Sequence, residues 1–255
     1  MDWRRMHKLV ASLPFRFCGF RVSALSSSEA PLEAALSSTR EVDRQSTVRA
    51  LGQSVSFAQQ LGCDTLLLEA GAVPVTGEVS HTDLGDRSAG WSTDAAGALW
   101  ARRQVRANAA LETLCRSLHG LCKSFPDMTF CLGLSRDVLS LGEPQALAAV
   151  FEDLSRYRVG YWHDTTAAAC RERFLREVPG RVLEEFSKNL KGMTLGDYGD
   201  SECYLPPGAG GVDYSLLSAY RRPSASQFPV VIELDPGVDP GEIPGIHAYL
   251  DKFGL

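Results

Sequence analysis

No segment of the 255-residue sequence is apolar over the roughly 20 residues that a membrane-spanning helix requires. Apolar runs such as residues 65–68 and 229–232 are far shorter. The charged residues at the N-terminus are not followed by an apolar segment, so the pattern of a secretory signal is also missing. We therefore expect a cytoplasmic protein without a membrane partner.

An excess of basic residues is absent as well. Lys and Arg number 26 against 31 Asp and Glu, and the formal net charge is −5 at pH 7. Proteins that bind nucleic acid neutralise phosphates with Lys and Arg, so this balance favours a small-molecule partner and argues against nucleic acid. The basic segment at residues 102–106 has helical spacing, and we interpret it as a solvated helix face.

Paired cysteines are the third absence. The seven cysteines are an odd number, and no two have the Cys-x-x-Cys spacing of zinc and redox sites. Most lie inside apolar stretches, as Cys18, Cys63 and Cys131 do. We expect reduced and mostly buried thiols, in keeping with a cytoplasmic location.

Segments with apolar residues every three or four positions alternate with short segments that are apolar throughout. Strands that are apolar on both faces are typical of a parallel sheet covered by helices. The alternation therefore predicts an α/β fold, either a doubly wound sheet or a (β/α) barrel. The expected strands are residues 15–25, 63–69, 129–134, 159–164, 190–196 and 228–234, and the expected helices are residues 2–13, 41–61, 98–124, 143–157, 170–188 and 212–221.

Two features favour the barrel. Polar residues follow the predicted strands, at the carboxyl ends where barrel enzymes build their sites. The Gly-x-Gly-x-x-Gly sequence of a dinucleotide-binding sheet is missing after an early strand. Because a closed barrel needs eight strands, we predict a TIM barrel that lacks its first one or two strands, in a single domain over residues 1–255. An open edge at the strand expected over residues 15–25 would favour self-association into a homo-oligomer.

Several polar side chains directly follow predicted strands. Asp164 and Glu233 occupy strand ends, where carboxylates point into the mouth of a barrel and can bind a divalent cation that polarises a carbonyl group. Asp164 is explained equally well as the N-cap of the next helix, whereas Glu233 has no obvious helix to cap. The further candidates for substrate binding are Glu69, Arg136, His163 and Asp197.

Three of these candidates have structural alternatives. Arg136 can clamp a phosphate or carboxylate, or it can pair with Asp137 or Asp164. Asp197 lies in a turn-rich segment, and turn chemistry explains it as well as substrate binding does. His163 neighbours Asp164 on a strand, so the two side chains should face opposite sides, and His163 can instead pack against a helix.

Residues 160–167, Gly-Tyr-Trp-His-Asp-Thr-Thr-Ala, are similar to the strand-six motif of the xylose-isomerase-like TIM barrels, an apolar strand followed by Asp-Thr-Gly-His. This superfamily contains sugar isomerases and epimerases and apurinic endonuclease IV. Residues 192–197 and 205–214 resemble its next unit, residues 228–233 its last strand, and residues 61–71 its fourth unit. The motifs occur in the family's order, so the resemblance implies that fold and a sugar-like substrate.

The metal ligands of that family are typically Glu, Asp, His and Glu at the ends of strands five to eight. By position the resemblance implies catalytic and metal-binding roles for Asp164 and Glu233, with Mg²⁺ or Mn²⁺ as the cofactor. The other two positions carry Ser135 and Thr194, and Ala167 replaces a further His. Two carboxylates without imidazole hold such an ion only weakly. The implied reaction is isomerisation or epimerisation by proton transfer next to a carbonyl group.

The substituted ligand positions also support a second hypothesis, in which the barrel has lost catalysis and binds a ligand or a partner protein. A role in DNA repair, by analogy with endonuclease IV, has less support because the chain is acidic and lacks that enzyme's many His ligands.

Overall fold

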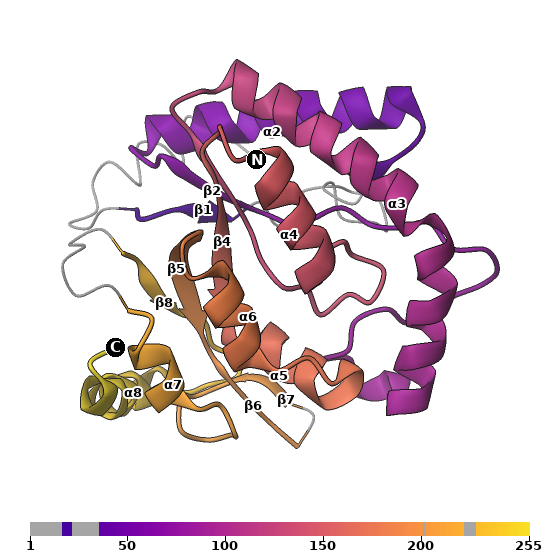
Figure 1. The fold of residues 1–255 in the computed structure, drawn as a ribbon. Coiled ribbons are helices and arrows are strands. Elements are labelled where there is room, and N and C mark those ends of the chain that lie inside the picture. Colours follow the sequence, from indigo (N-terminus) through magenta and orange to yellow (C-terminus); the bar gives the residue numbers. More distant parts are fainter. Residues whose placement is uncertain (1–16, 22–35, 201, 222–227) are drawn as a thin grey trace.

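A computed structural model describes residues 17–21, 36–200, 202–221 and 228–255 of the chain. Within these residues, six strands form one curled sheet in the order β1-β2-β3-β4-β5-β8, and every neighbouring pair is parallel (Figure 1). The strands are β1 (Phe20–Arg21), β2 (Thr65–Leu68), β3 (Thr129–Leu132), β4 (Val159–Asp164), β5 (Leu190–Leu195) and β8 (Val230–Ile232). This parallel half-barrel confirms the predicted fold class.

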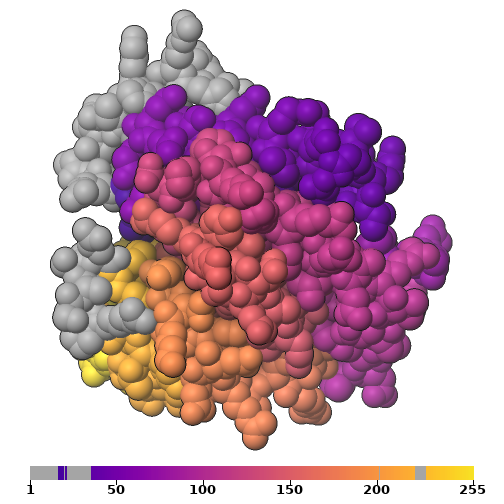
Figure 2. Space-filling model, turned by 45° about the horizontal axis from the view of Figure 1, so that its top comes forward, coloured from indigo at the N-terminus to yellow at the C-terminus, as the bar shows by residue number. Residues whose placement is uncertain are grey.

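Helices connect the strands, as parallel pairing requires. They are α2 (Glu41–Gln60), α3 (Thr93–Ser124), α4 (Pro144–Asp153), α5 (Thr165–Leu175), α6 (Pro179–Phe186), α7 (Tyr214–Ser218) and α8 (Ile243–Leu250). Figure 2 shows the indigo-to-magenta first half of the chain packed against the orange-to-yellow second half on one face of the molecule. None of the helices in the described ranges is both long enough and apolar enough to cross a membrane.

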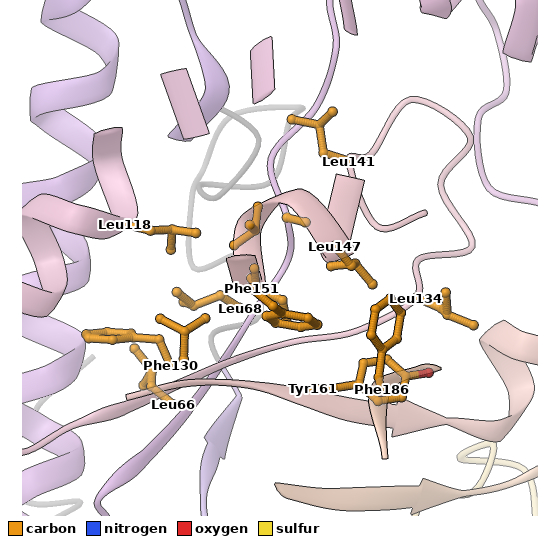
Figure 3. Packing of buried hydrophobic residues seen from close by; sticks show 14 of the residues in the cluster. Leu66, Leu68, Leu118, Phe130, Leu134, Leu141, Leu147, Phe151, Tyr161 and Phe186 are labelled. Carbon is orange, nitrogen blue, oxygen red and sulfur yellow. The ribbon is translucent and has the colours of Figure 1, made fainter. Parts of the chain in front are cut away.

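The outer face of the sheet packs on these helices. In Figure 3, Leu66 and Phe130 from the strands lie near Leu118 of α3, and Tyr161 lies near Phe151 of α4 and Phe186 of α6. All of these side chains are buried, and burying each large apolar side chain contributes about 1.5–3 kcal/mol. The main core therefore fixes the helices to the sheet.

The inner face carries a separate small cluster of Leu67, Cys131 and Trp162, with Val231 packed against it. Trp162 fits because Gly192 on the neighbouring strand has no side chain: a Cβ atom there would lie 2.4 Å from the indole ring. The indole Nε1 donates a hydrogen bond to the Thr194 hydroxyl at 2.9 Å. These side chains therefore fill the interior of the half-barrel just below the carboxyl ends of the strands.

Some predicted elements differ from those observed. The helix expected at residues 170–188 is two helices, because α5 ends at Arg176 with a left-handed φ of 60° and Pro179 begins α6. Residues 197–205, interpreted as turns, include a hairpin of β6 (Asp197–Gly199) and β7 (Glu202–Leu205). Helix α8 was not predicted, and α7 is shorter than expected. The helix expected at residues 2–13 and most of the strand expected at 15–25 lie outside the described residues.

The interpretation of residues 102–106 as a solvated face was wrong for Arg103. This side chain is fully buried, and its guanidinium is 2.6 Å from Glu143. Helix α3 turns Arg103 inward, toward the loop that follows β3, whereas Val105 is exposed. All seven cysteines are described and are free thiols, as predicted.

Candidate functional site

A pocket of about 520 Å³ opens at the carboxyl ends of the strands. Its position follows from the two-residue period of a strand: Glu69, Asp164 and Glu233 each lie two residues beyond an inner-face residue of their segment. These three acids therefore stand above the apolar cluster of the interior. The charged and polar side chains that line the pocket are Arg21, Glu69, Thr82, Asp83, Ser135, Arg136, Asp137, Ser140, Asp164, Tyr204 and Glu233.

Arg21, at the end of β1, makes the central contacts of this site. Its Nη1 lies 2.7 and 3.0 Å from the two carboxylate oxygens of Glu233. Its Nη2 lies 3.5 Å from Asp164 Oδ2 and 3.4 Å from the Thr194 hydroxyl. Burial alone would lower the pKa of Arg21, but Asp164 and Glu233 outweigh it and the pKa is raised. The guanidinium thus links β1 to the segment after β8, which are at opposite edges of the sheet.

Sequence reasoning missed Arg21. The strand was expected to continue to residue 25, so Arg21 was not identified as a strand-end residue. Residues two apart on a strand face the same side, so Arg21 shares the inner face with Gly19, which lies against Leu67. That two-residue spacing is the sequence signal that would have placed Arg21 inside the half-barrel.

Asp164 caps the next helix, one of the two roles that the sequence left open, and also lines the pocket. Its Oδ1 accepts a hydrogen bond from the Ala167 backbone N–H at 3.0 Å and caps α5. Its Oδ2 accepts a hydrogen bond from the Tyr204 hydroxyl at 3.3 Å and faces Arg21. The helix cap therefore holds the carboxylate in the pocket.

Glu233 and Glu69 are the other two pocket acids that follow inner-face strand residues; Asp83 and Asp137 also line the pocket. Burial raises the pKa of Glu233, and the charge of Arg21 opposes this rise without cancelling it. Glu69 is exposed to solvent through the pocket opening, although many protein atoms lie around it; their desolvating effect raises its pKa against a hydrogen bond from Ser135 and the charge of Arg21. Glu69 forms no ion pair with any described residue. Among Glu69, Asp164 and Glu233 it is therefore the carboxyl group that Arg21 does not engage in an ion pair, which leaves it available to exchange a proton.

Arg136 lines the pocket and pairs with neither of the partners considered from sequence. Its Nη2 donates to Asp83 Oδ2 at 3.0 Å, and its guanidinium lies 5.0 Å from the centre of the Tyr204 ring. Asp83 belongs to the long segment between β2 and α3, which reaches the loop after β3 through a bridge to Asp137. This segment therefore forms one wall of the pocket.

His163 and Asp197 are not among the residues that line the pocket. His163 is buried on the opposite face from Asp164, its Nδ1 lies 2.8 Å from the Tyr161 hydroxyl, and burial lowers its pKa to about 3. The carboxylate of Asp197 accepts hydrogen bonds from the backbone N–H groups of Tyr198, Gly208 and Val212, each at 2.9 Å. In the structure it organises the loop that follows the β6–β7 hairpin.

The site does not fit a divalent cation. Of the four positions where the resemblance implies ligands, Ser135 and Thr194 carry neutral hydroxyls, and Asp164 and Glu233 already face the guanidinium of Arg21. Throughout the described part of the chain, no three His, Cys, Asp or Glu side chains form a cluster that could hold a metal ion. A Mg²⁺ or Mn²⁺ ion would have to displace Arg21 to reach both carboxylates.

Two thiols lie beside this site. Cys203 of β7 and Cys170 of α5 are 3.7 Å apart, sulfur to sulfur. Hydrogen bonds from Cys170 and Arg136, together with the charge of Arg136, lower the pKa of Cys203 despite its partial burial. The thiolate form of Cys203 is therefore easier to reach than that of an ordinary cysteine.

We expect the alkylation of Cys203 by iodoacetamide to increase with pH around a midpoint below that of a free cysteine, because the thiolate is the reactive form and its pKa is lowered. Peptide mass spectrometry separates this site from the exposed Cys18. Arg136→Gln removes a positive charge that stabilises the thiolate and should move the midpoint upward. A midpoint at about 8.5, the value of a free cysteine, would contradict the expectation.

No model of a protein family and no curated protein matches the sequence. Solved structures do match. A D-tagatose 3-epimerase-like protein is 14% identical with a TM-score of 0.66, covering 99% of this chain and 82% of its own. The 3-keto-D-glucoside 4-epimerase of E. coli is 13% identical with a TM-score of 0.64, covering 98% and 84%. An AP endonuclease of family 2 from Brucella melitensis is 14% identical with a TM-score of 0.62, covering 96% and 84%. These likenesses show that the fold is that of the xylose-isomerase-like TIM barrels, as the motifs predicted.

Proposed function

We propose that this chain is an isomerase or epimerase of a small sugar or hydroxy-keto compound, and that it transfers a proton next to the carbonyl group. The observation that carries the proposal is that Glu69 and Glu233, two carboxyl groups of raised pKa, line one pocket together with the guanidinium of Arg21. Acids with raised pKa values in a cleft are typical of proton-transfer sites. The fold shared with an epimerase and with an epimerase-like protein supports the same reaction class.

In this proposal Glu69 is the proton acceptor, because Glu233 is engaged by Arg21 through both of its oxygens. Glu233 and Asp164 hold Arg21 in place rather than a metal ion. Arg136, paired with Asp83, and Tyr204 supply polar contacts for substrate hydroxyl groups. A pocket of about 520 Å³ has the size of a small-molecule site, and the charged and hydroxyl side chains among its lining residues can form hydrogen bonds with a polyhydroxylated ligand.

The test is solvent exchange. The protein is incubated in heavy water with a panel of ketoses and aldoses, with and without Mn²⁺, and deuterium at the carbon next to the carbonyl is followed by NMR. We expect at least one sugar to incorporate deuterium faster than in the protein-free control. Incorporation detects proton transfer whichever product forms, so no exchange with any member of the panel would count against the proposal.

The second candidate function is binding without catalysis. The observation that favours it is the occupation of both remaining carboxylates, Asp164 and Glu233, by Arg21. Calorimetric titration with the same sugars separates the two functions. Saturable binding with no deuterium exchange supports the binding module, whereas binding with exchange supports the enzyme.

A further inference from the structure

The guanidinium of Arg21 is a cation held by the side chains of Glu233, Asp164 and Thr194. Nη1 is shared by both oxygens of Glu233, and Nη2 faces Asp164 and the Thr194 hydroxyl. The resemblance implies metal ligands at four positions. Three of them, Asp164, Thr194 and Glu233, contact this one guanidinium. Arg21 has 37% of its side chain exposed and lines the pocket, so it is both anchored and open to a ligand.

We propose that Arg21 takes the place of a divalent metal ion, and that this site works without one. The inference deepens the proposed function and rests on it for the reaction. The guanidinium stays positively charged at all physiological pH values and donates hydrogen bonds in a fixed plane. Placed beside a substrate carbonyl oxygen, it stabilises the negative charge that develops there during proton abstraction.

The substitutions at the ligand positions are consistent with a guanidinium. A neutral hydroxyl is a weaker ligand for a metal ion than a carboxylate or an imidazole, whereas it readily accepts a hydrogen bond from a guanidinium N–H group. Thr194 accepts one hydrogen bond from Trp162 Nε1 at 2.9 Å and lies 3.4 Å from Arg21 Nη2. The Thr194 hydroxyl therefore lies between the Arg21 guanidinium and the Trp162 indole and contacts both.

The charges of the trio explain why a metal ion is excluded. Arg21 contributes one positive charge to two carboxylates, which leaves a net charge of −1. A divalent cation that reached Asp164 and Glu233 would meet the guanidinium at close range, and the bidentate pair with Glu233 would have to break. Without imidazole ligands, the ion would recover little of that cost.

The step balances without any co-reactant. A Glu69 oxygen takes the proton, the C–H bond next to the carbonyl breaks, and its electron pair forms the carbon–carbon double bond of the enediolate. The carbonyl electron pair moves to the oxygen beside Arg21, where the negative charge is stabilised. In isomerisation, Glu69 returns the proton to the former carbonyl carbon, while the hydroxyl proton of the neighbouring carbon moves to the oxygen beside Arg21, so that the carbonyl and hydroxyl groups exchange places. In epimerisation, a proton from solvent water adds to the other face of the same carbon, the carbonyl group forms again, and Glu69 releases its proton to solvent. The reaction is an internal rearrangement of the substrate, so neither the substrate nor the protein is oxidised or reduced overall.

The first experiment needs no variant. The EDTA-treated wild-type protein is titrated with Mn²⁺, Mg²⁺ and Zn²⁺ by calorimetry, and the melting temperature is recorded with each metal. We expect no saturable site tighter than about 1 mM and no metal-dependent rise in melting temperature. A micromolar site in the wild-type protein, lost in Glu233→Gln, would overturn the inference.

The second experiment removes the guanidinium. Arg21→Met leaves Asp164 and Glu233 without their cation, and we expect it to bind Mn²⁺ at least about tenfold more tightly than the wild-type protein. Arg21→Met with Glu233→Gln should lose that gain. Arg40→Met, which removes an exposed arginine outside the pocket, is the matched control and should behave as wild type.

A folded Arg21→Met protein that gains no affinity for Mn²⁺ would also overturn the inference. Near-UV circular dichroism reports the folding of the variant, and if it does not fold, the wild-type titration decides the question. The proposed function fails separately. If the wild-type protein rejects the metals and no sugar exchanges deuterium, the reaction is wrong and Arg21 remains the cation of a binding site.

Discussion

Replacing Arg103 with methionine is expected to lower the free energy of unfolding by about 3–5 kcal/mol, the cost of breaking a buried ion pair on one side. Arg103 is fully buried, and its Nη2 donates to Glu143 Oε2 at 2.6 Å and to the Ser140 carbonyl at 2.7 Å. Methionine fills part of the volume but leaves the Glu143 carboxylate buried without its partner. Burial raises the pKa of Glu143, and the nearby charge of Arg103 opposes that rise.

Urea denaturation of three variants tests this expectation. Arg102→Met is the matched control, because the neighbouring arginine is exposed and donates one hydrogen bond to the Thr76 carbonyl. It should cost less than about 1 kcal/mol. Arg103→Met combined with Glu143→Gln should be less destabilised than Arg103→Met alone, because no buried charge is left unpaired. A loss below about 1 kcal/mol in Arg103→Met would show that the pair contributes little.

The same pair affects the pocket. Arg103 connects α3 to the segment after β3, which also carries Ser135, Arg136 and Asp137 of the pocket lining. A weakened pair should therefore loosen that wall as well as lower stability. This explains why a helix near the surface carries a charged residue into the interior.

Glu69→Gln is expected to reduce the rate of deuterium exchange into the substrate by about 10²–10⁴-fold, the usual contribution of a positioned general base. Glutamine keeps the size of the side chain but cannot accept the proton. Because Glu69 has no ion pair with the described residues, its loss should leave Arg21, Asp164 and Glu233 in their present contacts. Sugar affinity, measured by calorimetry, should change by no more than a few-fold.

Glu78→Gln is the matched control for this substitution. Glu78 is an exposed glutamate in the segment after β2, and it is not part of the pocket lining. Its exchange rate should equal that of the wild-type protein. Exchange at the wild-type rate in Glu69→Gln would remove Glu69 from the reaction and would make Glu233 and Asp137, the other pocket acids of raised pKa, the next ones to test.

The sequence by itself determined the α/β class, the parallel sheet and the strand-end positions of Glu69, Asp164 and Glu233. These features depend on local periodicity: apolar residues repeat with the spacing of a helix or a strand, and the residue after a parallel strand comes to the edge of the sheet. The resemblance added the specific fold. Local pattern also predicted the free cysteines, and it offered the N-cap role of Asp164 as one of two alternatives.

Only the tertiary structure decided which side chains meet. Arg21 and Glu233 are 212 residues apart in the chain, and they pair because the curl of the sheet brings its two edge strands together. No local pattern carries that information, since many acids were available to one arginine. The same holds for Arg103, whose helical spacing did not distinguish a solvated face from one turned toward Glu143. Side-chain chemistry can be predicted along the chain, but the choice of partner depends on how the elements pack.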